Sequence, residues 1–293
     1  MAAGQHVDLH GLPGHAPLGR QTEYASEYQP SLLCPIPRAP SRQGLSIDQQ
    51  GAEQTLPFFG VDLWTGYELS WLNSRGKPCV AVAEFSFPCE STAIIESKSF
   101  KLYLNSFNQT VFKSMAEVKA RLERDLSAVA GVEVWLRLTA LSDADWAALG
   151  TLEGVCIDAL DVAIDCYHPQ PDLLCLEASP THSALGHTSE SLYSHLLKSN
   201  CPVTGQPDWA SLHVEYEGNK ICREGLLKYL VSFRQHQDFH EHCVERIFVD
   251  IMARCQPQKL TVSARYTRRG GLDINPLRST EAGPWPQRRL VRQ

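Results

Sequence analysis

An internal repeat is the feature that most limits how this 293-residue chain can fold. With a shift of 126 residues, six of the fifteen positions in 95–109 are identical to their counterparts in 221–235. With a shift of 125 residues, Asp125 matches Asp250. Repetition at a fixed offset indicates duplication of one supersecondary unit. We therefore expect two copies of a module with the order strand, strand, helix, helix, strand, strand.

Hydrophobic periodicity predicts the elements of both copies. Ser114 and Glu117 have the spacing of a capping box, which marks a helix start. In the first copy we expect strands over 67–72 and 79–87 with a turn at 73–76, helices over 99–107 and 114–130, and a strand over 133–138. In the second copy we expect a strand over 209–217, helices over 222–235 and 239–254, and a strand over 260–266.

The two modules are flanked by segments without such periodicity. Residues 1–55 are rich in Gly, Pro, Gln and Ser, which predicts a leader that wraps around the fold or stays loose. We expect an N-terminal module at 56–140, a linker at 141–190 and a C-terminal module at 191–293. This order of elements predicts an α+β fold, in which each module has an antiparallel sheet with two helices on one face.

The charge and hydropathy of the chain exclude several function classes. The formal net charge of −6 argues against general binding of nucleic acid, because that affinity needs Lys and Arg to neutralise phosphates. Residues 259–293 nevertheless hold eight Lys or Arg and two acids, a local basic patch that suits a bound phosphate. No apolar run is long enough to cross a membrane and no secretion signal is visible, so we expect a cytoplasmic protein.

Residues that occur in only one copy are the candidates for chemistry. The first copy has Glu96, Ser97 and Lys98 at a predicted helix start, whereas the counterpart at 222–229 lacks this leading Glu and the Ser-Lys pair. Free backbone N–H groups at a helix start favour negative charge, which suits an anionic or polar ligand. A capped and solvated helix end is the alternative interpretation.

A cysteine in a loop is the second candidate. Cys201 lies in a segment punctuated by Pro and Gly, and Asp208 follows seven residues later. A thiol becomes a nucleophile when its thiolate is stabilised, although most loop thiols are inert. The ten cysteines show no CxxC spacing, so we expect free thiols and neither a zinc ribbon nor a redox dithiol.

The third candidate is the start of the last predicted helix. His240, His242 and Cys243 have a spacing that zinc ligands can use. Glu241 offers two acceptor oxygens, which can grip adjacent N–H donors of a purine-like base or simply face the helix dipole. These residues alone leave both interpretations open.

Four segments taken together closely resemble the QueF family of NADPH-dependent 7-cyano-7-deazaguanine reductases, in its long, two-module form. The segments are 96–103, 199–201 with Asp208, 239–241 and 265–276. The resemblance extends from about residue 56 to Gln293. It implies two tandem tunnelling-fold (T-fold) modules, of which the first carries the cofactor motif and the second carries the nucleophile.

The resemblance also implies an activity. The family reduces the nitrile 7-cyano-7-deazaguanine to 7-aminomethyl-7-deazaguanine for queuosine synthesis, with two NADPH and a covalent thioimide. A nitrile accepts hydride poorly, whereas thiol addition creates a carbon–nitrogen double bond that can be protonated and attacked. The chain lacks the Gly-rich dinucleotide fingerprint, which fits a cofactor held outside a Rossmann fold. The implied assembly is a homodimer that binds this small substrate, without direct contact to nucleic acid or membrane.

Each family role can be assigned to a position of this chain. The resemblance makes Cys201 the nucleophile and Asp208 the proton donor. It assigns substrate binding to Ile95, Glu96, Ser97, His240 and Glu241, and NADPH binding to Ser97, Lys98, Arg269 and Gly270, with no metal. Two alternatives stay open: a zinc-dependent T-fold enzyme of pterin metabolism, which would use His240, His242 and Cys243, and a purine- or pterin-binding module without catalysis.

Overall fold

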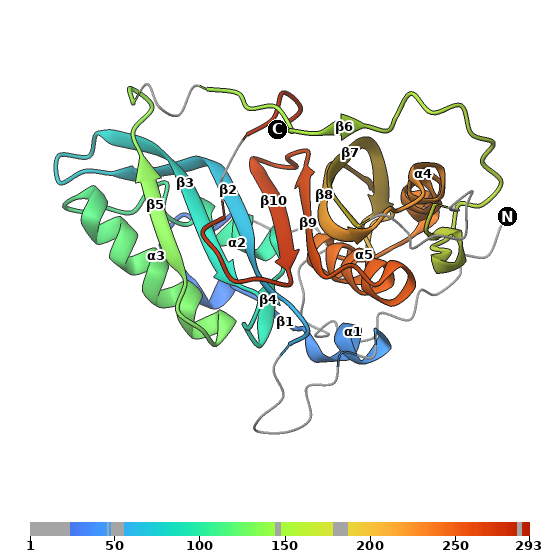
Figure 1. The fold of residues 1–293 in the computed structure, drawn as a ribbon. Coiled ribbons are helices and arrows are strands. Elements are labelled where there is room, and N and C mark those ends of the chain that lie inside the picture. Colours follow the sequence, from blue (N-terminus) through green and yellow to red (C-terminus); the bar gives the residue numbers. More distant parts are fainter. Residues whose placement is uncertain (1–23, 46, 48–55, 144–147, 178–186, 286–288) are drawn as a thin grey trace, which may run out of the picture.

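One eight-stranded sheet organises the chain, as the computed structural model in Figure 1 shows. The structure describes residues 24–45, 47, 56–143, 148–177, 187–285 and 289–293. Helices pack against the sheet, so the class is α+β, as expected. In these described residues no helix combines the length and the apolar content that crossing a bilayer requires.

The strands of the large sheet follow the order β5-β3-β2-β10-β9-β8-β7-β6. Their bounds are β2 Phe59–Leu72, β3 Pro78–Pro88, β5 Trp135–Thr139, β6 Val155–Cys156, β7 His187–Asn200, β8 Pro207–Asn219, β9 Lys259–Tyr266 and β10 Leu272–Ser279. All neighbours are antiparallel except β6 and β7, which makes the sheet mixed. A second, two-stranded sheet pairs β1 (Pro35–Pro37) with β4 (Ala93–Ile95).

Two hydrophobic cores lie between the sheet and its helices. The helices are α1 Ala39–Gly44, α2 Ser97–Asn105, α3 Met115–Ala130, α4 Arg223–Ser232 and α5 His240–Cys255. In the N-terminal half, the ring of Phe100 on α2 packs edge-on against Trp64 and Phe85 at 5.3 and 4.9 Å. Burying one such aromatic side chain stabilises the fold by about 1.5–3 kcal/mol. The C-terminal core forms in the same way where α4 and α5 meet β7–β9.

The internal repeat is visible in the structure. Helices α2 and α4 begin 126 residues apart, and α3 and α5 begin 125 residues apart. The Tyr103 hydroxyl on α2 donates to Asp125 Oδ2 on α3 at 2.8 Å, and the Tyr229 hydroxyl on α4 donates to Asp250 Oδ2 on α5 at 2.6 Å. The identical residues that revealed the repeat therefore include the tyrosine and the aspartate whose hydrogen bond joins the two helices of each pair.

Most predicted elements are confirmed with shifted ends, but five strands were missed: the short strands β1, β4 and β6 and the longer strands β7 and β10. The capping box is present, since Ser114 Oγ accepts from the backbone N–H of Glu117 at 3.2 Å. Strand β7 starts inside the predicted linker. Its sequence is polar and gives no strand pattern, so the strand is recognised only from its pairing with β8. Strand β10 lies between β2 and β9 and joins the two halves into one sheet. The division of the chain at residues 140 and 190 stays a prediction.

Residues 24–45 of the predicted leader pack into the fold; most of its other residues lie outside the described part of the chain. Arg42 on α1 donates to Glu245 Oε1 at 2.7 Å, and Arg278 bridges Glu245 and Asp62, at 2.8 Å each. Arg38 completes this buried cluster through Asp62. Burial opposes ionisation of Glu245, but Arg278 and Arg42 outweigh it and hold its pKa well below the usual range. Loss of one partner from such a pair costs about 3–5 kcal/mol.

Candidate active site

The turn between β7 and β8 holds Cys201. The side chain is only 3% exposed. The Cys201 backbone N–H donates to the Gln206 carbonyl at 2.9 Å, and the Cys201 carbonyl accepts from the Gly205 N–H at 3.0 Å. Gly205 has φ +68°, a conformation that favours glycine. The turn therefore fixes the thiol at the end of the hairpin.

Asp208 lies on β8, opposite Ser199 and close to Cys201 in the same hairpin. Its carboxylate is 4% exposed and pairs with Arg269, whose Nε lies 2.9 Å from Oδ1. The other oxygen, Oδ2, is 3.5 Å from His240 Nε2. The structure thus brings together a carboxyl group, a guanidinium and an imidazole from three separate parts of the sequence.

The start of α5 supplies His240 and Glu241. The ring of His240 lies on the ring of Tyr266, with 3.9 Å between the centroids, and its Nε2 has no hydrogen-bond partner among the described residues. Glu241 is 1% exposed, and its Oε1 likewise has none. Burial, with a further contribution from Asp62, raises the pKa of Glu241. A buried acceptor left unpaired in this way is suited to N–H donors of a ligand.

The neighbouring histidine does not join His240. His242 Nδ1 lies 3.1 Å from Asp238 Oδ1, and although burial opposes the charged form, this carboxylate raises the pKa of His242. His240 instead faces Asp208, and Cys243 is fully buried in α5. The three side chains proposed as zinc ligands in the pterin alternative are therefore directed to different partners.

Ile95 at the end of β4 and Ser97 at the start of α2 line the pocket of Cys201. The Glu96 side chain is not among the lining residues. It caps α2 by accepting from the N–H groups of Lys98 and Ser99 at 2.8 and 2.7 Å. Burial raises the pKa of Glu96. Glu96 thus caps the helix as in the alternative interpretation, but it is buried rather than solvated, and its role in substrate binding stays a prediction.

One narrow pocket collects most of the predicted residues. Its lining also includes Trp64, Phe239 and Ile274, which the sequence analysis did not assign to a site. The full lining is Trp64, Ile94, Ile95, Ser97, Cys201, Pro202, Asp208, Asp238, Phe239, His240, Glu241, Arg269 and Ile274. No sequence signal singles out Trp64, because a large aromatic residue inside a strand usually belongs to the core.

A wider groove of about 330 Å³ adjoins this pocket and shares Ser97, His240 and Arg269 with it. Lys98, Lys101 and Arg269 give the groove its positive charge. Gly270 has φ +58°, and a Cβ at this position would lie 2.8 Å from Lys101 Nζ. The cations fit the phosphates of a nucleotide, and the shared lining residues place the groove beside the pocket of Cys201.

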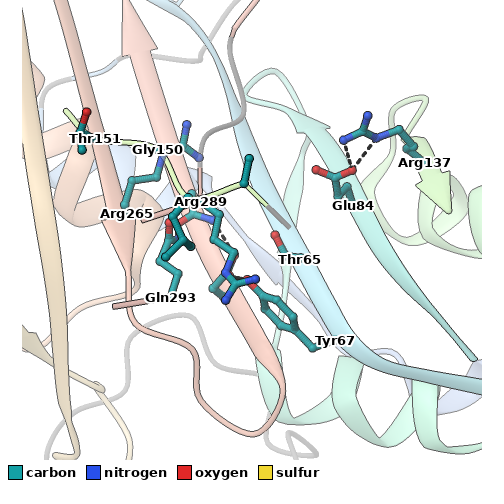
Figure 2. Close-up of a pocket in the computed structure, with 13 residues that line it drawn as sticks. Thr65, Tyr67, Glu84, Arg137, Gly150, Thr151, Arg265, Arg289 and Gln293 are labelled. Carbon is teal, nitrogen blue, oxygen red and sulfur yellow. Dashed lines mark hydrogen bonds and ion pairs between the residues drawn. The ribbon is translucent and has the colours of Figure 1, made fainter. Parts of the chain in front are cut away.

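A different cavity of about 410 Å³ lies on the other face of the sheet (Figure 2). Thr65 lines it, whereas the adjacent Trp64 lines the pocket of Cys201, because successive strand residues face opposite sides. Arg137 pairs with Glu84 there, and the lining contains no Cys or His. The candidate chemistry therefore belongs to the narrower pocket.

Two family descriptions match the chain over both halves. Residues 24–138 match "Nitrile reductase, 7-cyano-7-deazaguanine-reductase N-term", and residues 207–284 match "QueF-like protein". With a buried thiol and carboxyl group beside a cationic groove, fold and site define a protein of the nitrile reductase class.

Curated relatives are similar to this chain over nearly its whole length. The NADPH-dependent 7-cyano-7-deazaguanine reductase of Bordetella parapertussis is 58% identical over 95% of this chain and 98% of its own length. Those of Dechloromonas aromatica and Cupriavidus metallidurans are 56% and 53% identical, over 92% and 96% of this chain and 92% and 99% of theirs. The chain belongs to the family of NADPH-dependent 7-cyano-7-deazaguanine reductases.

A solved structure of the archaeosine synthase QueF-Like in the apo form is more remote. It is 18% identical, with a TM-score of 0.30, and covers 35% of this chain and 100% of its own. The family assignment depends on the curated relatives and the family matches.

Proposed function

We propose that this chain reduces 7-cyano-7-deazaguanine to 7-aminomethyl-7-deazaguanine through a covalent thioimide on Cys201. NADPH-dependent reduction of this nitrile, in queuosine biosynthesis, is the activity of its family. The observation that supports the mechanism best is the pocket itself, where Cys201 and Asp208 of one hairpin and Glu241 of α5 line one space. An intact set of this kind also argues against a binding module without catalysis.

The thiol and the carboxyl group divide the first step between them. The Cys201 thiol gives its proton to the Asp208 carboxylate and its sulfur adds to the nitrile carbon, and Asp208 is the proposed donor of that proton to the nitrogen. The product is a thioimide in which carbon is bonded to sulfur and doubly bonded to nitrogen. Complete reduction then adds two hydrides and two protons and returns the free thiol. Low exposure of both side chains keeps water away from the intermediate.

Recognition of the base is proposed for the other end of the pocket. The unpaired Oε1 of buried Glu241 faces N–H donors of the pyrimidine edge, and His240 lies beside Asp208. The lining residues Trp64 and Phe239 provide aromatic surface for a flat heterocycle. Ile95, Glu96 and Ser97 complete the proposed substrate site, in which the Glu96 carboxylate also caps α2.

The groove beside the pocket is the proposed site of NADPH, which supplies hydride when it is bound. Ser97, Lys98, Arg269 and Gly270 are the proposed contacts, and Lys101 adds positive charge. Arg268 points elsewhere, since its guanidinium lies 4.3 Å from the Tyr67 ring centroid and donates to the Gln293 carbonyl. Among the basic candidates for the extra phosphate of NADPH, the structure therefore favours Arg269 over Arg268.

The finer architecture is also proposed here: two tandem T-fold modules in a cytoplasmic homodimer. The repeated Tyr–Asp hydrogen bonds and the repeated helix pairs support the two modules. The free state of all ten cysteines is consistent with the cytoplasm. Strand β5 ends the sheet with Trp135 54% exposed, which leaves an edge for a second copy. Light scattering of the purified chain tests the dimer, and a monomer would contradict it.

The stoichiometry of the reaction tests the proposed function. Purified chain, 7-cyano-7-deazaguanine and excess NADPH should yield the primary amine with two NADPH oxidised per nitrile, because reduction to the amine needs four electrons. Loss of absorbance by NADPH and mass analysis of the product measure both quantities. A ratio of one, or NADPH oxidation without amine, would contradict the proposal. Activity that persists after a chelator has removed bound metal separates it from the zinc-dependent pterin alternative.

Replacement of Arg269 by Ala should raise the Michaelis constant for NADPH far more than that for the nitrile. The variant should also show a smaller preference for NADPH over NADH, because the guanidinium of Arg269 is suited to bind the extra phosphate of NADPH. Steady-state kinetics with both nucleotides measure this. Since Arg269 also pairs with Asp208, adduct formation without NADPH should be measured separately. Arg268→Ala is the matched control, and an unchanged nucleotide preference in Arg269→Ala would move the phosphate site elsewhere.

A further inference from the structure

Three side chains with metal-ligand chemistry meet at the edge of the sheet, outside the pocket of Cys201. Cys156 ends β6, Asp158 follows two residues later, and His195 lies on β7. One possible ligand atom from each lies within 4.8 Å of the other two. In the part of the chain that the structure describes, no second group of His, Cys, Asp and Glu side chains meets this condition.

Backbone pairing holds this cluster together. Strand β6 lies beside β7 (Figure 1) and runs parallel to it, and in this pairing Cys156 is opposite Tyr193. The N–H of Ile157 donates to the Tyr193 carbonyl at 3.0 Å. The segment between the two halves is therefore fixed to β7 at the point where Cys156 and Asp158 project their side chains.

The carboxylate is oriented by two further hydrogen bonds. Asp158 Oδ1 accepts from Ser194 Oγ at 2.6 Å, and Oδ2 accepts from the backbone N–H of His195 at 2.9 Å. Each carboxylate oxygen has a second lone pair, so both can still bind a cation. Outer hydrogen bonds of this kind are typical of carboxylates that bind metals.

The imidazole is oriented in the same way. His195 Nδ1 lies 2.7 Å from Ser211 Oγ, and the ring packs edge-on against Tyr193 with 5.3 Å between the centroids. With the proton on Nδ1, the lone pair of Nε2 is available to a metal. The guanidinium of Arg292 binds the His195 carbonyl at 3.0 Å and Ser211 Oγ at 3.4 Å, so a cation already lies beside this serine.

We propose that Cys156, Asp158 and His195 bind one zinc ion. A thiolate, an imidazole and a carboxylate are the ligands that zinc prefers, and a water completes four-coordinate geometry. The thiol proton passes to solvent as the sulfur–zinc bond forms. The thiolate and the carboxylate neutralise the two positive charges of the ion. The positive charge of Arg292 nearby therefore does not prevent zinc binding. Because β6 pairs over only two residues, the ion would tie the connecting segment to the sheet edge.

Zinc titration of the full chain tests the site. Protein stripped with a chelator should bind one equivalent of Zn²⁺ in competition with a chromophoric chelator, and Cys156→Ser should lose this binding. Ser211→Ala should weaken the affinity about 10–100-fold, the usual effect of removing an outer partner of a ligand. With Co²⁺ as the probe, a thiolate-to-cobalt charge-transfer band should appear in wild type and be absent in Cys156→Ser.

Two variants control for other thiols. Cys166→Ser removes a cysteine from the same connecting segment and should bind zinc like wild type. Cys201→Ala should also keep one equivalent, which separates this site from the nucleophile. No zinc binding by wild type, equal affinity in Cys156→Ser, or loss of the ion in Cys201→Ala would each overturn the proposal. None of these outcomes depends on reductase activity, so failure of the zinc site and failure of the proposed function remain distinguishable.

Discussion

A Cys201→Ala variant should form no covalent adduct with 7-cyano-7-deazaguanine and should not reduce it. Only a thiolate can add to the nitrile carbon, so its removal abolishes the first step. Wild type mixed with the nitrile in the absence of NADPH should gain the mass of one substrate per chain. Alanine keeps the backbone hydrogen bonds of Cys201 with Gln206 and Gly205, so the fold should remain intact. Intact-mass spectrometry and circular dichroism measure the two effects.

Cys89→Ala is a suitable control for this variant. Cys89 is as buried as Cys201, but burial raises its pKa to about 12, which keeps it in the thiol form. It lies outside the lining of the pocket. The adduct and turnover should therefore persist in Cys89→Ala. An adduct that persists in Cys201→Ala would show that another residue is the nucleophile.

An Asp208→Asn variant should still bind the nitrile but form the thioimide about 10²–10⁴-fold more slowly, the range for loss of a general acid. Asparagine keeps the size of the side chain, and its amide oxygen can still accept from Arg269 Nε, 2.9 Å from Oδ1 in the structure. The proton is then the main loss. A time course of adduct mass after mixing gives the rate, and equilibrium binding of the nitrile gives the affinity.

Glu241→Gln provides the contrast for this experiment. One of its oxygen acceptors becomes an N–H₂ donor that faces donors, so affinity for the nitrile should fall while adduct formation at saturation is spared. If Asp208→Asn weakened affinity and Glu241→Gln slowed adduct formation, the proposed roles of the two residues would be exchanged. An unchanged adduct rate in Asp208→Asn would make His240, 3.5 Å from Asp208, the next candidate for the proton donor.

The sequence predicted α2, α3, α4 and α5 well because their signals are local, whereas the short α1 was missed. Spacing and caps are properties of neighbouring residues, as with Ser114 at the start of α3. Strand β7 depends on its partner β8, and β10 on both β2 and β9, so their pairing could not be derived from local patterns. The burial of Arg38 and Arg42 was missed for the same reason, since Asp62 and Glu245 lie far from them in sequence.

The residues of the candidate site were predicted from motifs rather than from physical signals. The structure brings Cys201, Asp208, His240 and Arg269 together, yet neither spacing nor charge relates these positions in the sequence. The motif did not indicate that the Glu96 carboxylate caps α2, and the role of Glu96 in substrate binding stays a prediction. Whether a side chain faces the ligand or the backbone depends on local geometry that a motif does not contain.

The central place of β10 has a consequence for synthesis of the chain on the ribosome. Strand β2 ends at Leu72, but its partner β10 begins at Leu272. One edge of β2 therefore stays unpaired while the ribosome adds 200 further residues. At about 5–20 residues per second this delay is about 10–40 s. During that time the N-terminal half exposes an unpaired strand, the kind of edge to which other chains can add. Nascent chains on the same messenger therefore have an opportunity for mispairing that ends only when the last strand of the sheet is made.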